Sequence, residues 1–229
     1  MGFKKIGVVV ADSDEFAPLE SVLDNVKVIN TPFQSAIEFK VLNTQVIAVL
    51  CGIGKVNAAM SAMYLIDCGC DLIMNFGLSG SLKGNRRGDF ILPESFLEHD
   101  FDLTPLGYKP CEKPNQDYIY NADKKLLDLL CNLPYVKRSG TAVCGDRFIN
   151  DSKSRSFLTD TFSAESCDME TAAIAGTCHI TKTPFVALRR ISDDASDNAA
   201  ESYSQMNKGE GMTLCDVFIS ALKTICQEK

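Results

Sequence analysis

Continuous runs of apolar, mostly β-branched residues alternate along this chain with segments of helical spacing. Three such runs are Lys5–Ala11, Asp71–Asn75 and Phe185–Ile191. A strand without polar alternation is buried on both faces, which is typical of parallel sheets covered by helices. The sequence therefore predicts an α/β fold with three layers, α/β/α, around a central mixed, mostly parallel sheet.

Shorter sequence patterns predict the remaining strands, turns and helices around these strands. A hairpin is expected from Glu38–Leu42 and Gln45–Cys51, and further strands from Asp89–Leu92 and Thr141–Cys144. The glycine-rich stretch 77–80 is expected to be a turn that ends the preceding strand, and 103–123 a mobile loop. Helices are predicted from Ser13 as N-cap, from Gly52 to about Cys68, and over Asp123–Leu133, Met169–His179 and Thr213–Cys226.

Three of these helices have a defined apolar face in the sequence, and in the closing helix it consists of Leu214, Phe218, Leu222 and Ile225. In the helix after Ser13 the apolar positions are Phe16, Leu19, Val22 and Leu23. In the helix after Gly52, one face carries Val56, Met60, Met63 and Tyr64. Apolar residues at this spacing are typical of helices that pack on a sheet.

The composition and net charge of the chain exclude some kinds of binding partner. The 229 residues carry 23 basic and 30 acidic side chains, a net charge of −7, so a nucleic acid is not an expected partner. No apolar stretch approaches the roughly 20 residues that span a bilayer, and no membrane partner is expected. Without repeats or linker-like stretches, residues 1–229 are expected to form a single domain.

The cysteines and histidines argue against disulfide bonds and against a metal site. The ten cysteines form no C-x-x-C pair and several lie in apolar runs, as expected for reduced core residues of a cytoplasmic protein. The two histidines have no paired spacing, so no metal site is expected. His99, between two acids, is expected at the surface, and His179 at a helix C-terminus.

Four acidic residues follow strands or begin helices, where α/β proteins bind ligands: Glu15, Asp146, Glu170 and Asp193. Helix capping explains many such carboxylates. Their neighbours indicate a role beyond capping, because Phe148 follows Asp146 at a flexible turn and offers a flat face for a base. The stretch Gly52-Ile-Gly-Lys55 lacks the rest of a phosphate loop, and Lys55 is expected to be a solvated residue at a helix start.

Four motifs in order carry a resemblance to a known family. They are Gly52–Ala59, Gly145–Asn150, Asp168–Ala175 and Arg189–Asp193. With them, the chain from Ile6 to Phe218 resembles the 5′-methylthioadenosine/S-adenosylhomocysteine nucleosidases of the purine nucleoside phosphorylase superfamily. The resemblance implies a nucleoside phosphorylase-like fold and hydrolysis of the N-ribosidic bond of a 5′-modified adenosine. It also implies no cofactor, and a homodimer in which a partner loop completes the 5′ pocket.

The resemblance assigns two catalytic carboxyl groups. Glu15 matches the base that deprotonates water, and Asp193 matches the acid that protonates or hydrogen-bonds adenine N7. Cleavage of a ribosyl C–N bond needs such a pair, as in inverting glycosidases. Burial in an adenine pocket is expected to raise the pKa of Asp193, whereas Glu15 at a helix N-terminus is expected to stay ionised.

The resemblance also assigns the binding residues. Ser192 would position Asp193, Glu170 would take the ribose hydroxyls, and Met169 would pack under the sugar. Phe148 would stack on the base and the backbone of Ile149 would read its edge. Arg189 would support the site from the side, and the alkylthio pocket would be lined by Ile53, Leu103, Leu106, Tyr108 and Tyr203.

Two alternatives stay open. A phosphorylase needs arginines for phosphate, but Asp12, Asp14 and Glu15 follow the first strand and Asn75 stands at the second arginine position, which favours water. A catalytically impaired nucleoside-binding relative is suggested by Leu78, where the family carries serine, and by Asp168, where it carries glutamate. Together with Asp12, which replaces a methionine, and Arg190, an extra charge beside Arg189, these departures leave the preferred 5′ substituent open, whether methylthio, homocysteinyl, hydrogen or futalosine-like.

Overall fold

The computed structural model describes residues 2–23, 25–205 and 213–228. Its centre consists of parallel neighbouring strands in the order β4-β1-β5-β10, all almost fully buried. These strands include the continuous apolar runs of the sequence, which have neighbours on both faces of the sheet. Their bounds are Lys5–Val10 for β1, Thr44–Leu50 for β4, Leu72–Ser81 for β5 and Phe185–Asp193 for β10.

The remaining strands make the sheet mixed. β10 runs antiparallel to β6, β6 and β8 are parallel, β8 and β9 are parallel, and β9 returns antiparallel to β5. The sheet thus closes on itself through these five strands, while the predicted hairpin of β3 and β4 extends its other edge. The bounds are Lys27–Val28 for β2, Ser35–Val41 for β3, Phe90–Glu98 for β6, Tyr120–Asn121 for β7, Val136–Cys144 for β8 and Ala164–Asp168 for β9.

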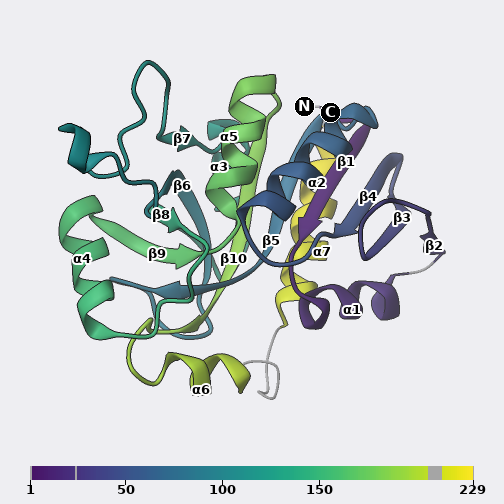
Figure 1. Cartoon of the computed structure of the whole chain (residues 1–229). Helices are drawn as coiled ribbons and strands as arrows, with labels where there is room; N and C mark the ends of the chain where they lie inside the picture. Colours follow the sequence, from purple (N-terminus) through teal and green to yellow (C-terminus); the bar gives the residue numbers. More distant parts are fainter. Residues whose placement is uncertain (1, 24, 206–212, 229) are drawn as a thin grey trace.

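Helices lie on both sides of the sheet. α2 and α5 pack against each other in one layer, α7 packs against α1 and α3 in the other, and the sheet lies between them (Figure 1). The predicted three-layer α/β/α fold is therefore confirmed. The helices are α1 (Ser13–Val22), α2 (Lys55–Asp67), η1 (Thr104–Leu106), α3 (Lys124–Leu130), α4 (Ser152–Phe162), α5 (Thr171–Thr181), α6 (Ala199–Ser204) and α7 (Leu214–Gln227).

The turn expected at residues 77–80 is wrong, because β5 runs straight through it to Ser81. Gly77 lies within the strand, and side chains approach its backbone on the side where a Cβ would stand. A Cβ placed there would lie 2.5 Å from Arg189 Nη1 and 2.9 Å from Glu15 Oε2. Glycine is needed at this position because two buried charged side chains lie against the backbone.

Two predicted helix starts are shifted. Asp12, not Ser13, is the N-cap of α1, because Asp12 Oδ1 accepts a hydrogen bond from Asp14 N at 2.7 Å. The predicted start of α5 at Met169 moves to Thr171, whose backbone N–H donates to Asp168 Oδ1 at 2.9 Å. In both cases a carboxylate just before the helix satisfies a free backbone donor.

Several side chains predicted to belong to the apolar faces of α1 and α2 are exposed instead. Val22 of α1 is exposed, and so are Val56, Met60 and Met63 of α2. α2 packs through the small side chains of Ala58, Ser61 and Ala62 together with Leu65, which allow it close to its neighbours. Within the described ranges, no helix is both long enough and apolar enough to cross a membrane.

Candidate active site

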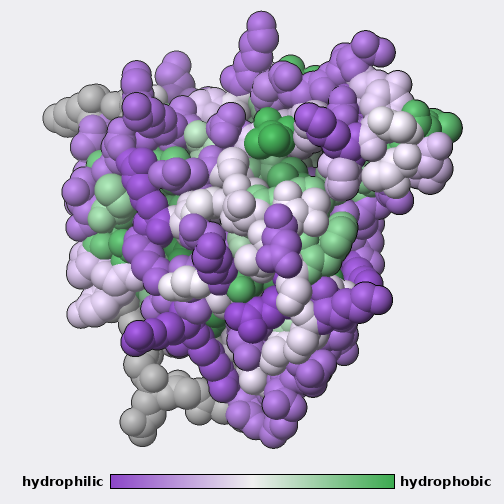
Figure 2. Space-filling view, turned by 90° about the vertical axis from the view of Figure 1, so that its left-hand side faces the viewer, coloured by the Kyte–Doolittle hydropathy of each residue, from purple (hydrophilic) through white to green (hydrophobic). Residues whose placement is uncertain are grey.

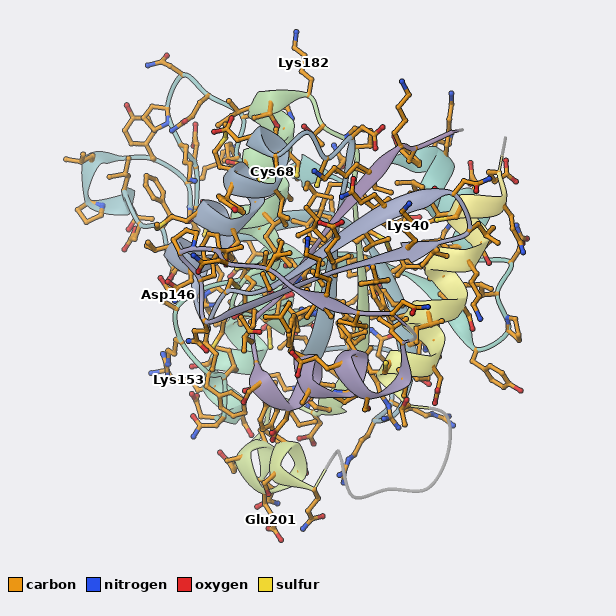
Figure 3. The ribbon with its side chains drawn as sticks, turned by 90° about the vertical axis from the view of Figure 1, so that its right-hand side faces the viewer. Lys40, Cys68, Asp146, Lys153, Lys182 and Glu201 are labelled. Carbon is orange, nitrogen blue, oxygen red and sulfur yellow. The ribbon has the colours of Figure 1, made fainter. Side chains whose placement is uncertain are left out.

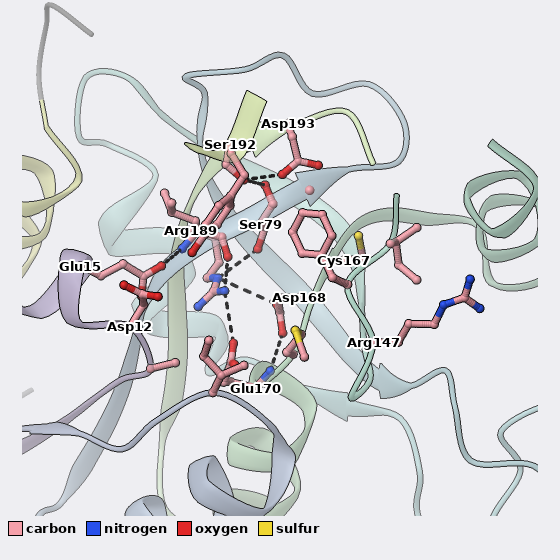
Figure 4. Close-up of a pocket in the computed structure, with 18 of the residues that line it drawn as sticks. Asp12, Glu15, Ser79, Arg147, Cys167, Asp168, Glu170, Arg189, Ser192 and Asp193 are labelled. Atoms are coloured by element: carbon pink, nitrogen blue, oxygen red, sulfur yellow. Dashed lines mark hydrogen bonds and ion pairs between the residues drawn. The ribbon is translucent and has the colours of Figure 1, made fainter. Parts of the chain in front are cut away.

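A cavity of about 430 Å³ opens beside the carboxyl ends of β1, β8, β9 and β10 (Figure 4). This volume suits a small organic ligand, and the position is the one that α/β sheets use for ligands. Most residues proposed from the sequence line it together. They are Glu15, Ile53, Leu78, Phe148, Ile149, Met169, Glu170, Arg189, Ser192, Asp193 and Tyr203.

Three proposed residues do not line this cavity: Leu103, Leu106 and Tyr108. They belong to the segment 99–119 between β6 and β7, where Leu106 is 71% exposed and Tyr108 is 37% exposed. Within one chain, these three residues therefore lie outside the cavity that Ile53 and Tyr203 line.

Glu15 is a buried carboxyl group in the first turn of α1. Its Oε1 accepts a hydrogen bond of 2.7 Å from the backbone N–H of Leu78. Burial raises the pKa of Glu15 to about 8, although Arg189 and the Leu78 N–H lower it. The expectation of an ionised Glu15 at neutral pH is therefore wrong for the free protein, because desolvation outweighs the helix N-terminus.

Asp193 ends β10 and is almost fully buried. Ser192 Oγ donates to its Oδ2 at 2.6 Å, and Ala195 N donates to its Oδ1 at 2.8 Å. Burial raises the pKa of Asp193 despite these two donors, as the sequence predicted. The carboxyl group is thus held in a fixed orientation in an environment that favours its protonated form.

Arg189 is the buried cation of the site. Its Nε donates to Ser79 Oγ at 3.0 Å and its Nη1 to Asn75 Oδ1 at 2.8 Å, while Nη2 donates to the carbonyl of Leu78. Carboxylate oxygens also surround it, with Asp168 Oδ2 at 3.9 Å from Nε. The guanidinium therefore bonds to the protein on every nitrogen and compensates part of the acidic charge of the cavity.

Glu170 stands at the start of α5 and faces the cavity floor. Its Oε1 accepts a hydrogen bond from Gly54 N at 3.0 Å, and its Oε2 lies 3.7 Å from Arg189 Nη2. Burial raises the pKa of Glu170 as well, while Arg189 lowers it. This carboxyl group is suited to bind hydroxyl groups of a ligand.

Two aromatic rings form one wall of the cavity. Phe148 is 39% exposed, and its ring centroid lies 5.8 Å from that of Tyr203 in an edge-to-face arrangement. The adjacent Ile149 is buried. This wall therefore offers an open aromatic face, which is suited to stacking a flat heterocycle.

The chain matches the model of the phosphorylase superfamily over residues 5–223. It is 36% identical to a 5′-methylthioadenosine/S-adenosylhomocysteine nucleosidase of an Exiguobacterium species, over 81% of this chain and 83% of that protein. It is 31% identical to the nucleosidase of Staphylococcus saprophyticus, over 96% of this chain and 100% of that protein. The chain belongs to this nucleosidase family.

Solved structures agree with this membership. The nucleosidase of Neisseria meningitidis in complex with methylthio-immucillin-A matches with a TM-score of 0.84 and 30% identity over 97% of each chain. A futalosine hydrolase mutant of Helicobacter pylori matches with a TM-score of 0.88 and 23% identity, which shows a shared fold alone. The nucleosidase fold is thus shared by enzymes named for different 5′ groups, so the fold does not choose the substrate.

Several residues of the nucleosidase cavity were not expected from the sequence. Ser79 lies in the stretch expected to be a turn, and Cys167 lies on β9, which has no apolar run. Arg147 also lines the cavity, whereas Asp12, which lines it too, stands at a position that the resemblance places near the alkylthio pocket. The alternation of inward residues after Asn75 would have found Ser79, had the strand been extended through the glycines.

The two histidines of the chain lie outside this cavity. His99 is not a surface residue, because its Nε2 is buried and burial lowers its pKa; the described residues provide no hydrogen-bond partner for that atom. His179 lies in the last turn of α5 as expected, with Nε2 2.9 Å from Asp117 Oδ2. In the described ranges, no group of three histidine, cysteine or acidic side chains is placed to hold a metal ion.

Proposed function

We propose that this nucleosidase hydrolyses the N-ribosidic bond of 5′-methylthioadenosine and S-adenosylhomocysteine and releases adenine. One observation carries the proposal: two buried carboxyl groups, Glu15 and Asp193, reach one cavity from different sides (Figure 4). The names of the relatives support the choice of substrate. The aromatic wall and Glu170 provide places for the base and the ribose.

The reaction divides between these two groups. As the C–N bond breaks, positive charge develops on the ribose and negative charge on the adenine. Protonated Asp193 gives its proton to adenine N7, and ionised Glu15 takes a proton from the water that bonds to C1′. The products are adenine and a 5′-modified ribose, and each carboxyl group contributes roughly 10²–10⁴-fold in rate.

The charges of the cavity support water as the nucleophile. Arg189 would be the natural phosphate ligand, but three of its five N–H groups, one on each nitrogen, already donate to the protein. Asp12 lines the same space, and Glu15 and Glu170 add negative charge there when they ionise, so the cavity would repel a phosphate dianion. Water, being neutral, meets no such repulsion.

We expect adenine release to be independent of phosphate. Purified protein is incubated with methylthioadenosine, with and without phosphate, and adenine and sugar products are measured by chromatography. Equal adenine release with free methylthioribose supports hydrolysis. A ribose 1-phosphate product that forms only with phosphate would identify a phosphorylase, and no adenine from any 5′-modified adenosine would identify a nucleoside-binding relative.

We further propose that the nucleosidase is a homodimer. Val56 is 70% exposed and Met60 is 59% exposed on the outer face of α2, and Ile53 joins this face to the cavity. Figure 2 shows hydrophobic side chains at the surface on the side of the molecule that carries segment 99–119. Large exposed apolar patches mark interaction sites. A second copy would cover the outer face of α2, and its Leu103, Leu106 and Tyr108 would complete the 5′ pocket beside Ile53.

We expect a mass near twice that of one chain in analytical ultracentrifugation. Met60→Glu should shift the protein toward the monomer and raise KM for methylthioadenosine, because the cavity loses its partner segment. Val28→Glu is the matched control, since Val28 is also exposed, at 70%, but lies on β2, and it should remain dimeric. A monomeric wild-type protein with full activity would contradict the proposal.

The cysteines support a cytoplasmic location, which we also propose. All ten are free thiols and most are buried. Burial raises the pKa of several of them, including Cys51 and Cys178, both to about 12. Free thiols in this number are typical of a reducing compartment.

A further inference from the structure

Three residues from three segments form a closed ring of hydrogen bonds beside the active site. Asp100 Oδ2 accepts from Asp146 N at 2.9 Å, and Asp146 Oδ1 accepts from Lys55 N at 2.8 Å. Lys55 Nζ closes the ring on Asp100 Oδ1 at 2.5 Å and also lies 3.1 Å from Glu98 Oε2. We call Asp100, Asp146 and Lys55 the Lys55 ring. The side chain of Lys55 is only 17% exposed, so the expectation of a solvated lysine is wrong.

The Lys55 ring fixes the start of α2. Gly54, the N-cap residue, has no side chain to accept a hydrogen bond, and Asp146 provides the acceptor from 91 residues further along the chain. Figure 3 shows Asp146 and Cys68 at the two ends of this helix. Gly54 has a φ of +102°, and a Cβ there would lie 3.1 Å from Asp146 Oδ1. The backbone at 54–55 therefore has a conformation that the contact with Asp146 helps to maintain.

The same backbone turn holds Glu170. Gly54 N donates to Glu170 Oε1 at 3.0 Å, and this N–H directly precedes the one that Asp146 binds. Arg189 Nη2 lies 3.7 Å from the other oxygen of Glu170. A loss of Asp146 would free the start of α2 and remove one of the two groups that orient Glu170.

We propose that Asp146 is a positioning residue that, through the start of α2, orients Glu170 toward the ribose hydroxyls of the substrate. The inference rests on the proposed function, in which Glu170 binds those hydroxyls. Asp146 is thus required for discrimination between a ribosyl substrate and one that lacks a hydroxyl group. The stretch Gly52-Ile-Gly-Lys55 has its role here, as the turn between Asp146 and Glu170.

The test compares methylthioadenosine with its 3′-deoxy analogue. In Asp146→Ala, kcat/KM for methylthioadenosine should fall about 10- to 100-fold, since a displacement of about 1 Å in a positioned group has effects of this size. For the 3′-deoxy analogue it should fall much less, so the ratio of the two kcat/KM values should drop at least about tenfold. Asp146→Asn keeps an oxygen that accepts from Lys55 N, and it should restore the wild-type ratio.

Asp123→Ala is the matched control, because Asp123 also accepts a hydrogen bond from a backbone N–H at a helix start, from Leu126 N of α3 at 3.0 Å, and it does not line the cavity. It should keep the wild-type ratio while losing a helix cap. Circular dichroism and thermal unfolding report whether each variant is folded. Should Asp146→Ala not fold, Lys55→Met opens the ring at its side chain and should lower the ratio in the same direction.

Two results would overturn the inference alone. One is an unchanged ratio in folded Asp146→Ala, or in Lys55→Met if Asp146→Ala does not fold. The other is a drop of the same size in Asp123→Ala. In both, the wild-type protein releases adenine, so the proposed function stands. A wild-type protein that releases no adenine overturns the proposed function, and the inference falls with it.

Discussion

Asp193→Asn is expected to lower kcat/KM for adenine release by about 10²–10⁴-fold while the protein stays folded. The amide has nearly the same shape as the carboxyl group, and its oxygen can still accept from Ser192 Oγ or Ala195 N. It has no acidic proton to give to adenine N7. Burial raises the pKa of Asp193, which prepares the wild-type group for this donation. Adenine release in single-turnover experiments, together with thermal unfolding, checks the prediction.

Asp194→Asn is the matched control for this experiment. Asp194 is the next residue in the chain but is exposed, and its Oδ1 accepts from Ser196 Oγ at 2.6 Å. The pKa of Asp194 is lowered by these Ser196 donors, the opposite direction from Asp193. Turnover in Asp194→Asn should stay near the wild-type value. Near-normal turnover in Asp193→Asn would remove Asp193 from the role of acid.

The parts of the fold that were predictable are those where one local pattern has one physical meaning. β1 and β10 are buried on both faces, and their continuous apolar runs identify them directly. The capping box of α7 likewise follows from Thr213 and Asp216 in the sequence. In these elements the local preference and the final burial agree.

β9 was missed because its sequence is polar, and its half-buried Glu165 finds hydrogen-bond partners on β8. Its sequence, Ala164–Asp168, contains Glu165, whose Oε2 accepts from Ser139 Oγ at 2.9 Å and from Gly140 N at 2.8 Å. A local polar pattern predicts that such residues are exposed, since it contains no information about a partner 25 residues away in the chain. α4 was missed for the opposite reason: it lies at the surface, and Leu158 is its buried residue.

The members of the site were largely predictable, but their environments were not. The positions after strands and the four motifs pointed to Glu15, Glu170 and Asp193, which do line one cavity. The protonation of Glu15 depends instead on its burial, on the hydrogen bond from the backbone N–H of Leu78 and on the charge of Arg189 on β10. Lys55 was misjudged similarly, because its partners Glu98 and Asp100 lie far along the chain.

Glu15→Gln is expected to lower kcat/KM for adenine release by about 10²–10⁴-fold, because an amide cannot take a proton from water. The amide oxygen can still accept from Leu78 N, so the fold should persist. Glu20→Gln is the matched control, since Glu20 is an exposed carboxylate on the same helix and should be neutral in effect. Near-normal release in Glu15→Gln would exclude Glu15 as the base.

The pKa of Glu15 adds a pH signature that separates a base from a structural residue. In the wild-type protein the pH profile of kcat/KM should contain the ionisation of Glu15, whose pKa is about 8 in the free protein, and this ionisation should be absent from the residual activity of Glu15→Gln. The folded state binds the Glu15 proton more tightly than the unfolded chain does. The free energy of unfolding of the wild-type protein should therefore fall, relative to Glu15→Gln, as the pH rises from about 4.5 to about 8. Thermal unfolding of both proteins at pH 5 and pH 9 measures this difference, and a gap that does not widen at pH 9 would contradict a buried, protonated Glu15. A gap that widens would show that the catalytic carboxylate lowers stability in its ionised form, as expected of a group whose burial serves the reaction rather than the fold.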